Sequence, residues 1–213
     1  QNQVVVVLSA MAGETDRLVN LTKELSKDFP ASEYDVVISS GEQVSVGALS
    51  GLLNSYGIKS KSLLGWQVPI VTSSDHKSAR IEAISSEIIL KLLGENNVVI
   101  IPGFQGISVD GRITTLGRGG SDTSAVAIAA SIDADFCDIY TDVDGVYTTD
   151  PNKVPNAKRL DKISYEEMLE MASLGAKVLQ TRSVETAMNN DVFLRVLSSF
   201  SDTGKNKKGT LVC

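Results

Sequence analysis

Short apolar runs rich in Val and Ile recur along the chain, and amphipathic stretches separate them. A run of consecutive β-branched residues is typical of a strand buried on both faces of a sheet. Such runs predict strands at 4–8, 59–64, 68–72, 98–101, 136–141 and 192–198. Apolar residues at helical spacing predict helices at 16–27, 35–56 (broken near residues 39–42), 84–93, 164–174 and 181–190. Ser164 and Glu167 form an S-x-x-E pattern that predicts a capping box at the start of the helix 164–174.

Strands and helices alternate along most of the chain. The exception is Phe104–Thr114, where alternating residues and a turn at Asp110-Gly111 predict a β-hairpin. This order of elements predicts the α/β class: a three-layer αβα sandwich around a mostly parallel sheet, with the hairpin inserted. We expect residues 1–213 to form one domain.

Composition narrows the class of protein. The chain has a net charge of −6, and its one basic run, Lys205–Lys208, lies among polar residues typical of a solvated loop, so we expect no nucleic-acid partner. Cys137 and Cys213 show neither a disulfide nor a zinc-site pattern, which indicates a reducing, cytoplasmic environment. We find no signal peptide and no apolar run that looks long enough to cross a membrane.

The stretch T-T-L-G-R-G-G-S-D-T at 114–123 is the most informative loop. Its glycines permit a tight turn, Ser121 or Asp122 is expected to cap the small-residue helix that follows, and the helix N-terminus favours an anion. Arg118 adds a guanidinium fork that suits a carboxylate or a phosphate. The same residues also fit a glycine turn that merely begins a core helix. The stretch alone does not distinguish this structural role from an anion-binding site.

Three further loops are expected at the same edge of the sheet, because each follows a predicted buried strand or faces that edge. Open parallel sheets bind their ligands there, at the carboxyl ends of the strands. They are Ser9–Thr15, Ser39–Glu42 and Thr141–Tyr147, and none is a P-loop or a Rossmann fingerprint. Glu42 also fits a first-turn charge favoured by the helix dipole. His76, the only histidine, is interpreted as structural or surface.

Several of these motifs together resemble the aspartate kinases of the amino acid kinase family. The motifs are Ser40-Gly41-Glu42, Gly103-Phe104-Gln105-Gly106, T-L-G-R-G-G-S-D-T at 115–123, T-D-V-D-G-V-Y-T-T-D-P at 141–151 and Gly175-Ala176-Lys177-Val178-Leu179. The D-G-V-Y-T-x-D-P element is shared with uridylate kinase and indicates nucleotide binding only. The glycine stretch combined with S-G-E is more specific, and the resemblance covers essentially the whole chain.

The resemblance implies roles for residues that bind the acceptor. Glu42 holds the α-amino group of aspartate and Arg118 clamps its α-carboxylate. Asp122 holds the amino group and orients a catalytic lysine, and Ser9 and Thr15 lie in the loop that touches the substrate and the transferred phosphoryl group.

It also implies residues for the nucleotide. Thr141, Asp142 and Tyr147 line the adenosine site, and Lys177 reaches the nucleotide as a catalytic residue. Lys177 equally fits a stabilising cation near a helix C-terminus. Asn152 stands where an arginine commonly follows the D-P element and contacts phosphate. The neighbouring Lys153 is expected to take this nucleotide contact in its place, although Lys for Arg is not a neutral exchange at a phosphate.

The implied reaction is phosphoryl transfer from ATP to the β-carboxylate of L-aspartate, the first step of lysine, threonine and methionine biosynthesis. A carboxylate needs no general base, so positioning and charge neutralisation would carry the catalysis, with Mg²⁺ bound to the nucleotide and no residue assigned as a metal ligand. The alternatives are an amino acid kinase with another acceptor, such as glutamate or a nucleoside monophosphate, or a non-catalytic module that binds ATP or an amino acid.

The chain departs from the pattern of the family at both ends. It lacks the K-F-G-G-S/T-S strand whose lysine contacts the phosphates, and it lacks the C-terminal ACT domains. We therefore expect a truncated catalytic domain that is weakly active or inactive alone, from a full-length protein that forms a homo-oligomer.

Overall fold

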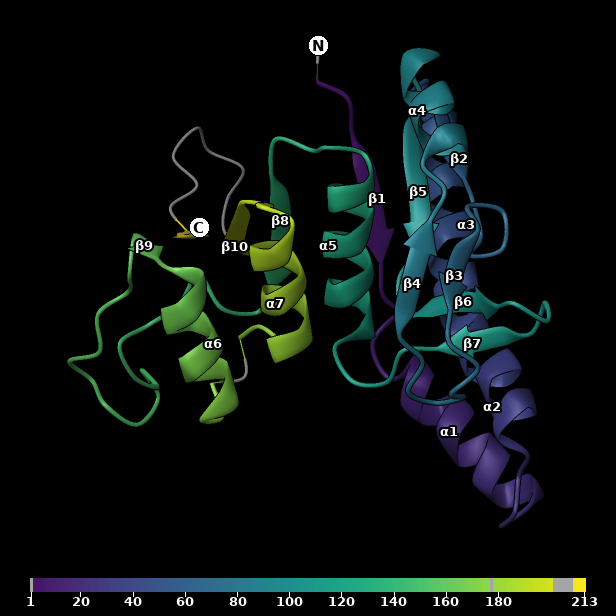
Figure 1. Ribbon diagram of the computed structural model, residues 1–213, viewed down its shortest axis with the longest axis horizontal. Coiled ribbons are helices and arrows are strands. Elements are labelled where there is room, and N and C mark those ends of the chain that lie inside the picture. The colour runs from purple at the N-terminus through teal and green to yellow at the C-terminus, as the bar shows by residue number, and fades with distance from the viewer. Residues whose placement is uncertain (1, 177, 201–208) are drawn as a thin grey trace. The chain divides into compact units, whose positions relative to one another are not determined.

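The computed structural model describes residues 2–176, 178–200 and 209–213. The chain forms two compact units, Gln1–Ile132 and Asp133–Cys213. In both units most strand pairs are parallel and helices flank the sheets, so the predicted α/β class is confirmed (Figure 1).

The first unit is built around a parallel sheet in the order β1-β5-β2, formed by Val5–Leu8, Val98–Pro102 and Ser60–Ser62. Successive side chains of its central strand, β5, point to opposite faces of the sheet, and Val99, Ile100 and Ile101 are all buried. Both faces of this strand are therefore covered. Val99 and Ile101 join a cluster with residues of α4 (Glu87–Gly94) and α5 (Gly120–Ser131). On the opposite face α3 (Ser40–Ser55) packs against β2 and β5, which completes three layers.

A second sheet of this unit has the order β4-β3-β6-β7, formed by Ile81–Ile84, Ile70–Thr72, Gln105–Ser108 and Ile113–Thr115. The predicted hairpin is confirmed as the antiparallel pair β6–β7. The helix predicted from residue 84 is wrong at its start, because Ile84 belongs to β4 and α4 begins at Glu87. The alternating residues 81–84 pair with β3, and Ser85 and Ser86 separate that strand from the helix.

The helical region predicted at 35–56 consists of α2 (Ala31–Ile38) and α3, with the break at Ser39 as expected. Its predicted start is wrong, because α2 begins at Ala31; α1 (Glu14–Leu25) precedes it. By length and composition alone, Ala31–Ser55 could cross a membrane, so the expectation of no sufficiently long apolar run is wrong on that criterion. In the structure this segment buries Asp35 and Glu42, and α3 packs on the sheet. It therefore has the contacts of core helices.

The second unit contains a sheet in the order β8-β10-β11-β9, formed by Cys137–Thr141, Leu194–Ser198, Thr210–Val212 and Lys162–Ile163. The helices α6 (Tyr165–Ser173) and α7 (Thr181–Asn189) pack against each other. The predicted capping box is confirmed: the N–H of Glu167 donates to the Ser164 hydroxyl and the N–H of Ser164 donates to the Glu167 carboxylate. The short strand β9 was not predicted.

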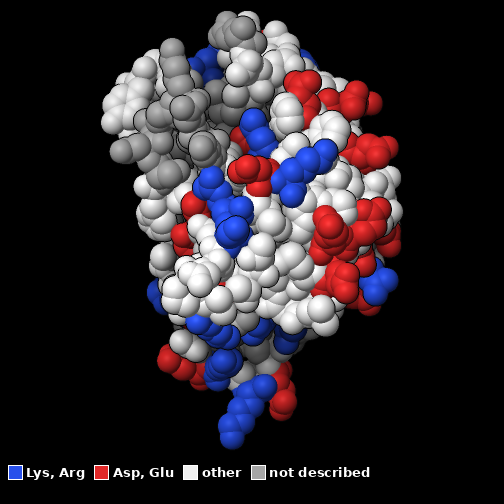
Figure 2. Space-filling model, turned by 90° about the vertical axis from the view of Figure 1, so that its left-hand side faces the viewer, with Lys and Arg blue, Asp and Glu red and all other residues white. Residues whose placement is uncertain are grey.

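Charged side chains of both signs are interspersed on the face drawn in Figure 2. Lys and Arg lie there in small groups, with acidic and uncharged side chains between them. This distribution differs from the basic stripe typical of a nucleic-acid-binding surface. The basic run Lys205–Lys208 lies outside the described residues.

Candidate functional site

The first part of the candidate site surrounds the carboxyl end of β1. Ser9 is exposed in the loop that follows this strand, and Thr15 lies in the first turn of α1. Glu42 lies in the first turn of α3 and reaches the same loop, where its Oε1 accepts a hydrogen bond from the N–H of Ala10 at 3.2 Å. Gly41 permits this approach, because a Cβ added there would lie 2.9 Å from the Cβ of Ala10.

Glu42 is the most perturbed acid of this region. Its side chain is only 3% exposed, and among the described residues its Oε2 has no hydrogen-bond partner. Burial raises the pKa of Glu42 from 4.5 to about 7, although the hydrogen bonds from its own backbone and from Ala10 act in the opposite direction. Glu42 lies in the first helical turn, as expected for a charge favoured by the helix dipole. Its burial shows that it is not a solvated surface charge.

The glycine-rich turn leads from β7 into α5. Gly117 and Gly119 have φ of 76° and 67°, so both occupy the left-handed region that favours glycine. Between them Arg118 is exposed. The prediction that Ser121 or Asp122 caps this helix is wrong, because α5 begins at Gly120 with Gly119 as N-cap and no side-chain cap.

The corner between β5 and β6 holds this turn in place. A Cβ on Gly103 would lie 2.7 Å from the Cα of Ser121, so only glycine permits such close packing. Phe104 has φ of 68°, an unfavourable conformation for a bulky residue, and its N–H donates to the Ser124 hydroxyl at 3.0 Å. The N–H of Gly103 donates to the carbonyl of Leu8 at 2.9 Å. The corner thus joins the end of β1 to the glycine turn.

Within the first unit, the structure therefore brings the five predicted acceptor-binding residues to one edge. Ser9, Thr15 and Glu42 surround the end of β1, while Arg118 and Asp122 lie on the turn packed against the end of β5. Asp122 is half-buried, and burial raises its pKa. Carboxylates beside a guanidinium and a glycine turn can bind a small molecule that carries both charges.

The second unit holds the residues predicted for the nucleotide. Thr141 ends β8, and its hydroxyl donates to the neighbouring Asp142 at 3.1 Å. Tyr147 donates from its hydroxyl to Asp144 at 2.9 Å, and this hydrogen bond is the main reason that the pKa of Tyr147 is raised. Lys153 is exposed and lies 3.9 Å from Asp150, and Lys177 lies outside the described residues.

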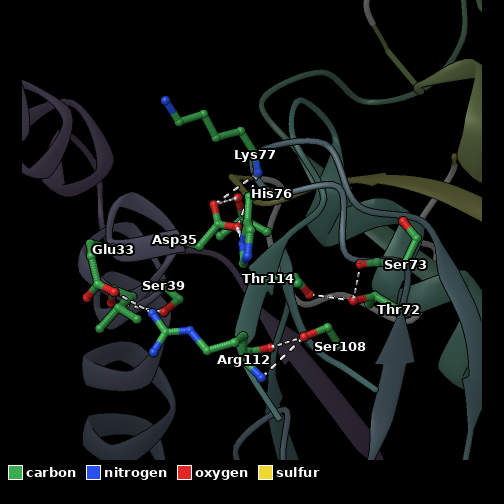
Figure 3. A network of polar contacts seen from close by, with 12 residues as sticks. Glu33, Asp35, Ser39, Thr72, Ser73, His76, Lys77, Ser108, Arg112 and Thr114 are labelled. Carbon is green, nitrogen blue, oxygen red and sulfur yellow. Dashed lines mark hydrogen bonds and ion pairs between the residues drawn. The ribbon is translucent and has the colours of Figure 1, made fainter. Parts of the chain in front are cut away.

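Two polar networks were missed by the sequence analysis. In the second unit, Arg159 binds Asp144 at 2.9 Å and so supports the partner of Tyr147. In the first, His76 binds the buried Asp35 (Figure 3). His76 was expected to be structural or surface, and its ring is indeed mostly buried in a structural contact. The only sequence signal for Asp35 is a carboxylate directly before an apolar helical run.

Comparison with known proteins adds an independent finding. A model of the amino acid kinase family matches residues 1–198. The aspartate kinase of Pseudomonas putida is 54% identical over 211 residues, which cover 99% of this chain and 50% of that protein. The chain thus spans about half the length of the curated relatives it matches.

Solved structures agree. The aspartate kinase from Synechocystis matches with a TM-score of 0.85 at 47% identity, covering 99% of this chain and 34% of that chain. Aspartokinase III of E. coli in complex with aspartate and ADP, in its R-state, matches with a TM-score of 0.79 at 34% identity, covering 94% of this chain and 46% of that chain.

Proposed function

The chain belongs to the amino acid kinase family, and from this premise we propose that the protein containing it is an aspartate kinase. It transfers the γ-phosphoryl group of ATP to the β-carboxylate of L-aspartate, giving 4-phospho-L-aspartate and ADP. Relatives named aspartate kinase support this proposal, as does the E. coli enzyme solved with aspartate and ADP.

The observation that carries the proposal is the buried carboxylate of Glu42. Its Oε2 lacks a hydrogen-bond partner among the described residues, and burying a charge is costly unless a partner compensates it. An ammonium group supplies both the opposite charge and the missing donors. An amino acid acceptor has this group, whereas a nucleoside monophosphate brings negative charge, so Glu42 favours the amino acid.

We assign the other residues of the first unit accordingly. Arg118 clamps the α-carboxylate with its guanidinium fork, and Asp122 holds the ammonium together with Glu42. Ser9 and Thr15 contact the transferred phosphoryl group and the substrate. The choice of aspartate over glutamate rests on the likeness to aspartate kinases.

The chemical step requires little from the protein besides placement. An oxygen of the β-carboxylate attacks the γ-phosphorus, the bond from that phosphorus to the β–γ bridging oxygen breaks, and ADP leaves with the electron pair. Because the ionised carboxylate is already a nucleophile, no general base is needed. The residues of this chain hold the acceptor in line and neutralise charge.

The nucleotide is assigned to the second unit. Thr141, Asp142 and Tyr147 contact the adenosine, and Lys153 and Lys177 contact phosphates, Lys177 as a catalytic residue together with Asp122. No group of three His, Cys, Asp or Glu side chains within the described ranges could hold a metal ion. We assign Mg²⁺ to the bound ATP, held mainly by the phosphates.

The proposal also places the protein in metabolism. We assign it to the first step of lysine, threonine and methionine biosynthesis in the cytoplasm, and we propose a homo-oligomer of the full-length protein. This assignment is supported by the relatives, which are named aspartate kinase or aspartokinase.

A hydroxamate assay of the full-length protein tests the function, because hydroxylamine traps an acyl phosphate. We expect turnover with L-aspartate and none with L-glutamate. Turnover of glutamate but not aspartate would reassign the acceptor. If neither amino acid turns over, the acceptor is another compound, such as a nucleoside monophosphate, or the protein is a non-catalytic binding module.

A further inference from the structure

A buried carboxylate outside the assigned site connects three distant segments of the first unit. Asp35 on α2 is fully buried. Its Oδ2 lies 2.7 Å from His76 Nδ1, and both carboxylate oxygens lie 3.1 Å from the N–H of Lys77 (Figure 3). The hydroxyl of Thr115 donates to Oδ1 at 2.7 Å. Since a carboxylate only accepts hydrogen bonds, every one of these contacts depends on its remaining an acceptor.

The segments that Asp35 joins are those that carry the proposed substrate ligands. Thr115 ends β7 and lies three residues before Arg118. On the other side, α2 passes into α3 at Ser39 without an intervening loop, and Glu42 lies in the first turn of α3. The bond from Thr115 to Asp35 is therefore a direct link between the strand that leads to Arg118 and the helices that lead to Glu42.

The loop with His76 and Lys77 strengthens this link. The N–H of Ala79 donates to the carbonyl of Thr115 at 2.9 Å, and a Cβ on Gly117 would lie 3.1 Å from the carbonyl oxygen of Lys77. The Lys77 ammonium also lies 4.6 Å from the ring centroid of Tyr34, the residue before Asp35. The loop is thus packed between α2 and the glycine turn.

We propose that Asp35 is a positioning residue for acceptor binding: it sets the separation between Glu42 and Arg118. The inference rests on the proposed function, in which these two side chains bind the ammonium and the carboxylate of one aspartate molecule. A ligand held at both ends needs its partners placed within a fraction of an ångström, and small displacements cost much affinity. ATP, assigned to the second unit, does not depend on this separation.

The test is Asp35→Asn in the full-length protein, with binding of L-aspartate and of ATP measured separately by calorimetry. Asn keeps the size of the side chain but replaces one acceptor oxygen with a donor amide. We expect the Kd of aspartate to rise about tenfold or more, in line with the cost of misplaced binding groups. The Kd of ATP should change by less than about twofold, because the residues assigned to ATP belong to the other unit and we treat the two sites as independent.

Two more variants complete the experiment. Thr115→Val removes only the hydroxyl donor at nearly constant volume, so it decides the matter if Asp35→Asn does not fold. Glu33→Gln is the matched control on the same helix, because it breaks an exposed ion pair with Arg112 and leaves Asp35 intact. We expect this control to leave both affinities unchanged.

The outcomes separate this inference from the function on which it rests. If the wild-type protein neither binds nor phosphorylates aspartate, the proposed function fails and the inference fails with it. If the wild type is active but the folded Asp35 or Thr115 variant loses only thermal stability, or loses both affinities equally, Asp35 is merely structural. Only a selective loss of aspartate binding supports positioning.

Discussion

At the scale of the residue, Glu42 shows how burial outweighs the local helix environment. A helix N-terminus stabilises a carboxylate by about 0.3–1 kcal/mol. The pKa of Glu42 is instead raised from 4.5 to about 7, which corresponds to about 3 kcal/mol against ionisation. Desolvation is the larger effect, so the free protein keeps a carboxyl group that a bound cation would stabilise in its ionised form.

Aspartate binding should accordingly depend on pH. The ammonium of aspartate binds the ionised form of Glu42, whose pKa is raised to about 7 by burial, so affinity should fall as the pH falls below that value. Calorimetry from about pH 5.5 to 8.5 should show a loss approaching tenfold per pH unit on the acidic side. In Glu42→Gln, affinity should be lower by about tenfold or more and this dependence should disappear. An unchanged slope in the variant would assign the titration to another group.

The same raised pKa predicts an effect on stability with the opposite sign. A carboxyl whose folded pKa is above its unfolded value contributes stability below pH 4.5, and this is lost as the pH rises through about 7. At about pH 8, Glu42→Gln should therefore raise the free energy of unfolding of the ligand-free protein by up to about 3 kcal/mol. Urea denaturation measures this gain, which should shrink toward pH 4.5.

Glu14→Gln serves as the control for that experiment. A hydrogen bond from Arg17 lowers the pKa of Glu14, so its removal cannot stabilise the protein by the same route. A Glu42→Gln protein that is less stable than the wild type at alkaline pH would contradict the burial argument.

At the scale of the element, the position of α3 depends on one glycine. Gly41 is where the helix approaches the loop after β1, and an added Cβ would contact Ala10 at 2.9 Å. Real Cβ atoms rarely come this close, so a larger residue must move the helix or the loop. Because Glu42 follows directly, such a shift also moves the proposed ammonium ligand.

Gly41→Ala is expected to destabilise the protein by about 1–3 kcal/mol through overpacking and to weaken aspartate binding. Gly47→Ala on the same helix is the matched control, because nothing lies within 4 Å of its added Cβ. That change should stabilise by about 0.5–1 kcal/mol, since alanine is the better helix former. Chemical denaturation and calorimetry report both quantities. Equal effects of the two substitutions would refute the close-approach explanation.

At the scale of the whole molecule, the proposed binding residues divide between the two units. Those for the acceptor lie within Gln1–Ile132, and those for the nucleotide lie within Asp133–Cys213. The chain spans about half the length of its curated relatives, so kinetic tests belong to the full-length protein.

This division predicts that two substitutions each raise the KM for a different substrate. Arg118→Lys should raise the KM for aspartate about tenfold, because lysine cannot form the bidentate contact, and should leave the KM for ATP nearly unchanged. Tyr147→Phe removes the hydroxyl that binds Asp144 and should raise the KM for ATP instead. Steady-state kinetics with each substrate varied in turn distinguishes the two. A shared rise in both constants would contradict the division.

The local patterns of the chain determined the α/β class, the buried strands, the hairpin and the Ser164 capping box. These features depend on neighbours in sequence, since hydrophobic periodicity and capping act over a few residues. The roles of Glu42 and Arg118 in binding aspartate were implied by the resemblance to aspartate kinases. Their roles in binding remain a proposal.

Only the tertiary structure decided which of these groups are buried and what they contact. It placed the N-cap of α5 at Gly119, whereas Ser121 lies within the first turn of the helix and packs against Gly103. It paired residues 81–84 with β3, and it brought Asp35, His76 and Thr115 together from separate segments. Desolvation and close packing depend on atoms distant in sequence, and for that reason no local pattern could reveal the raised pKa of Glu42.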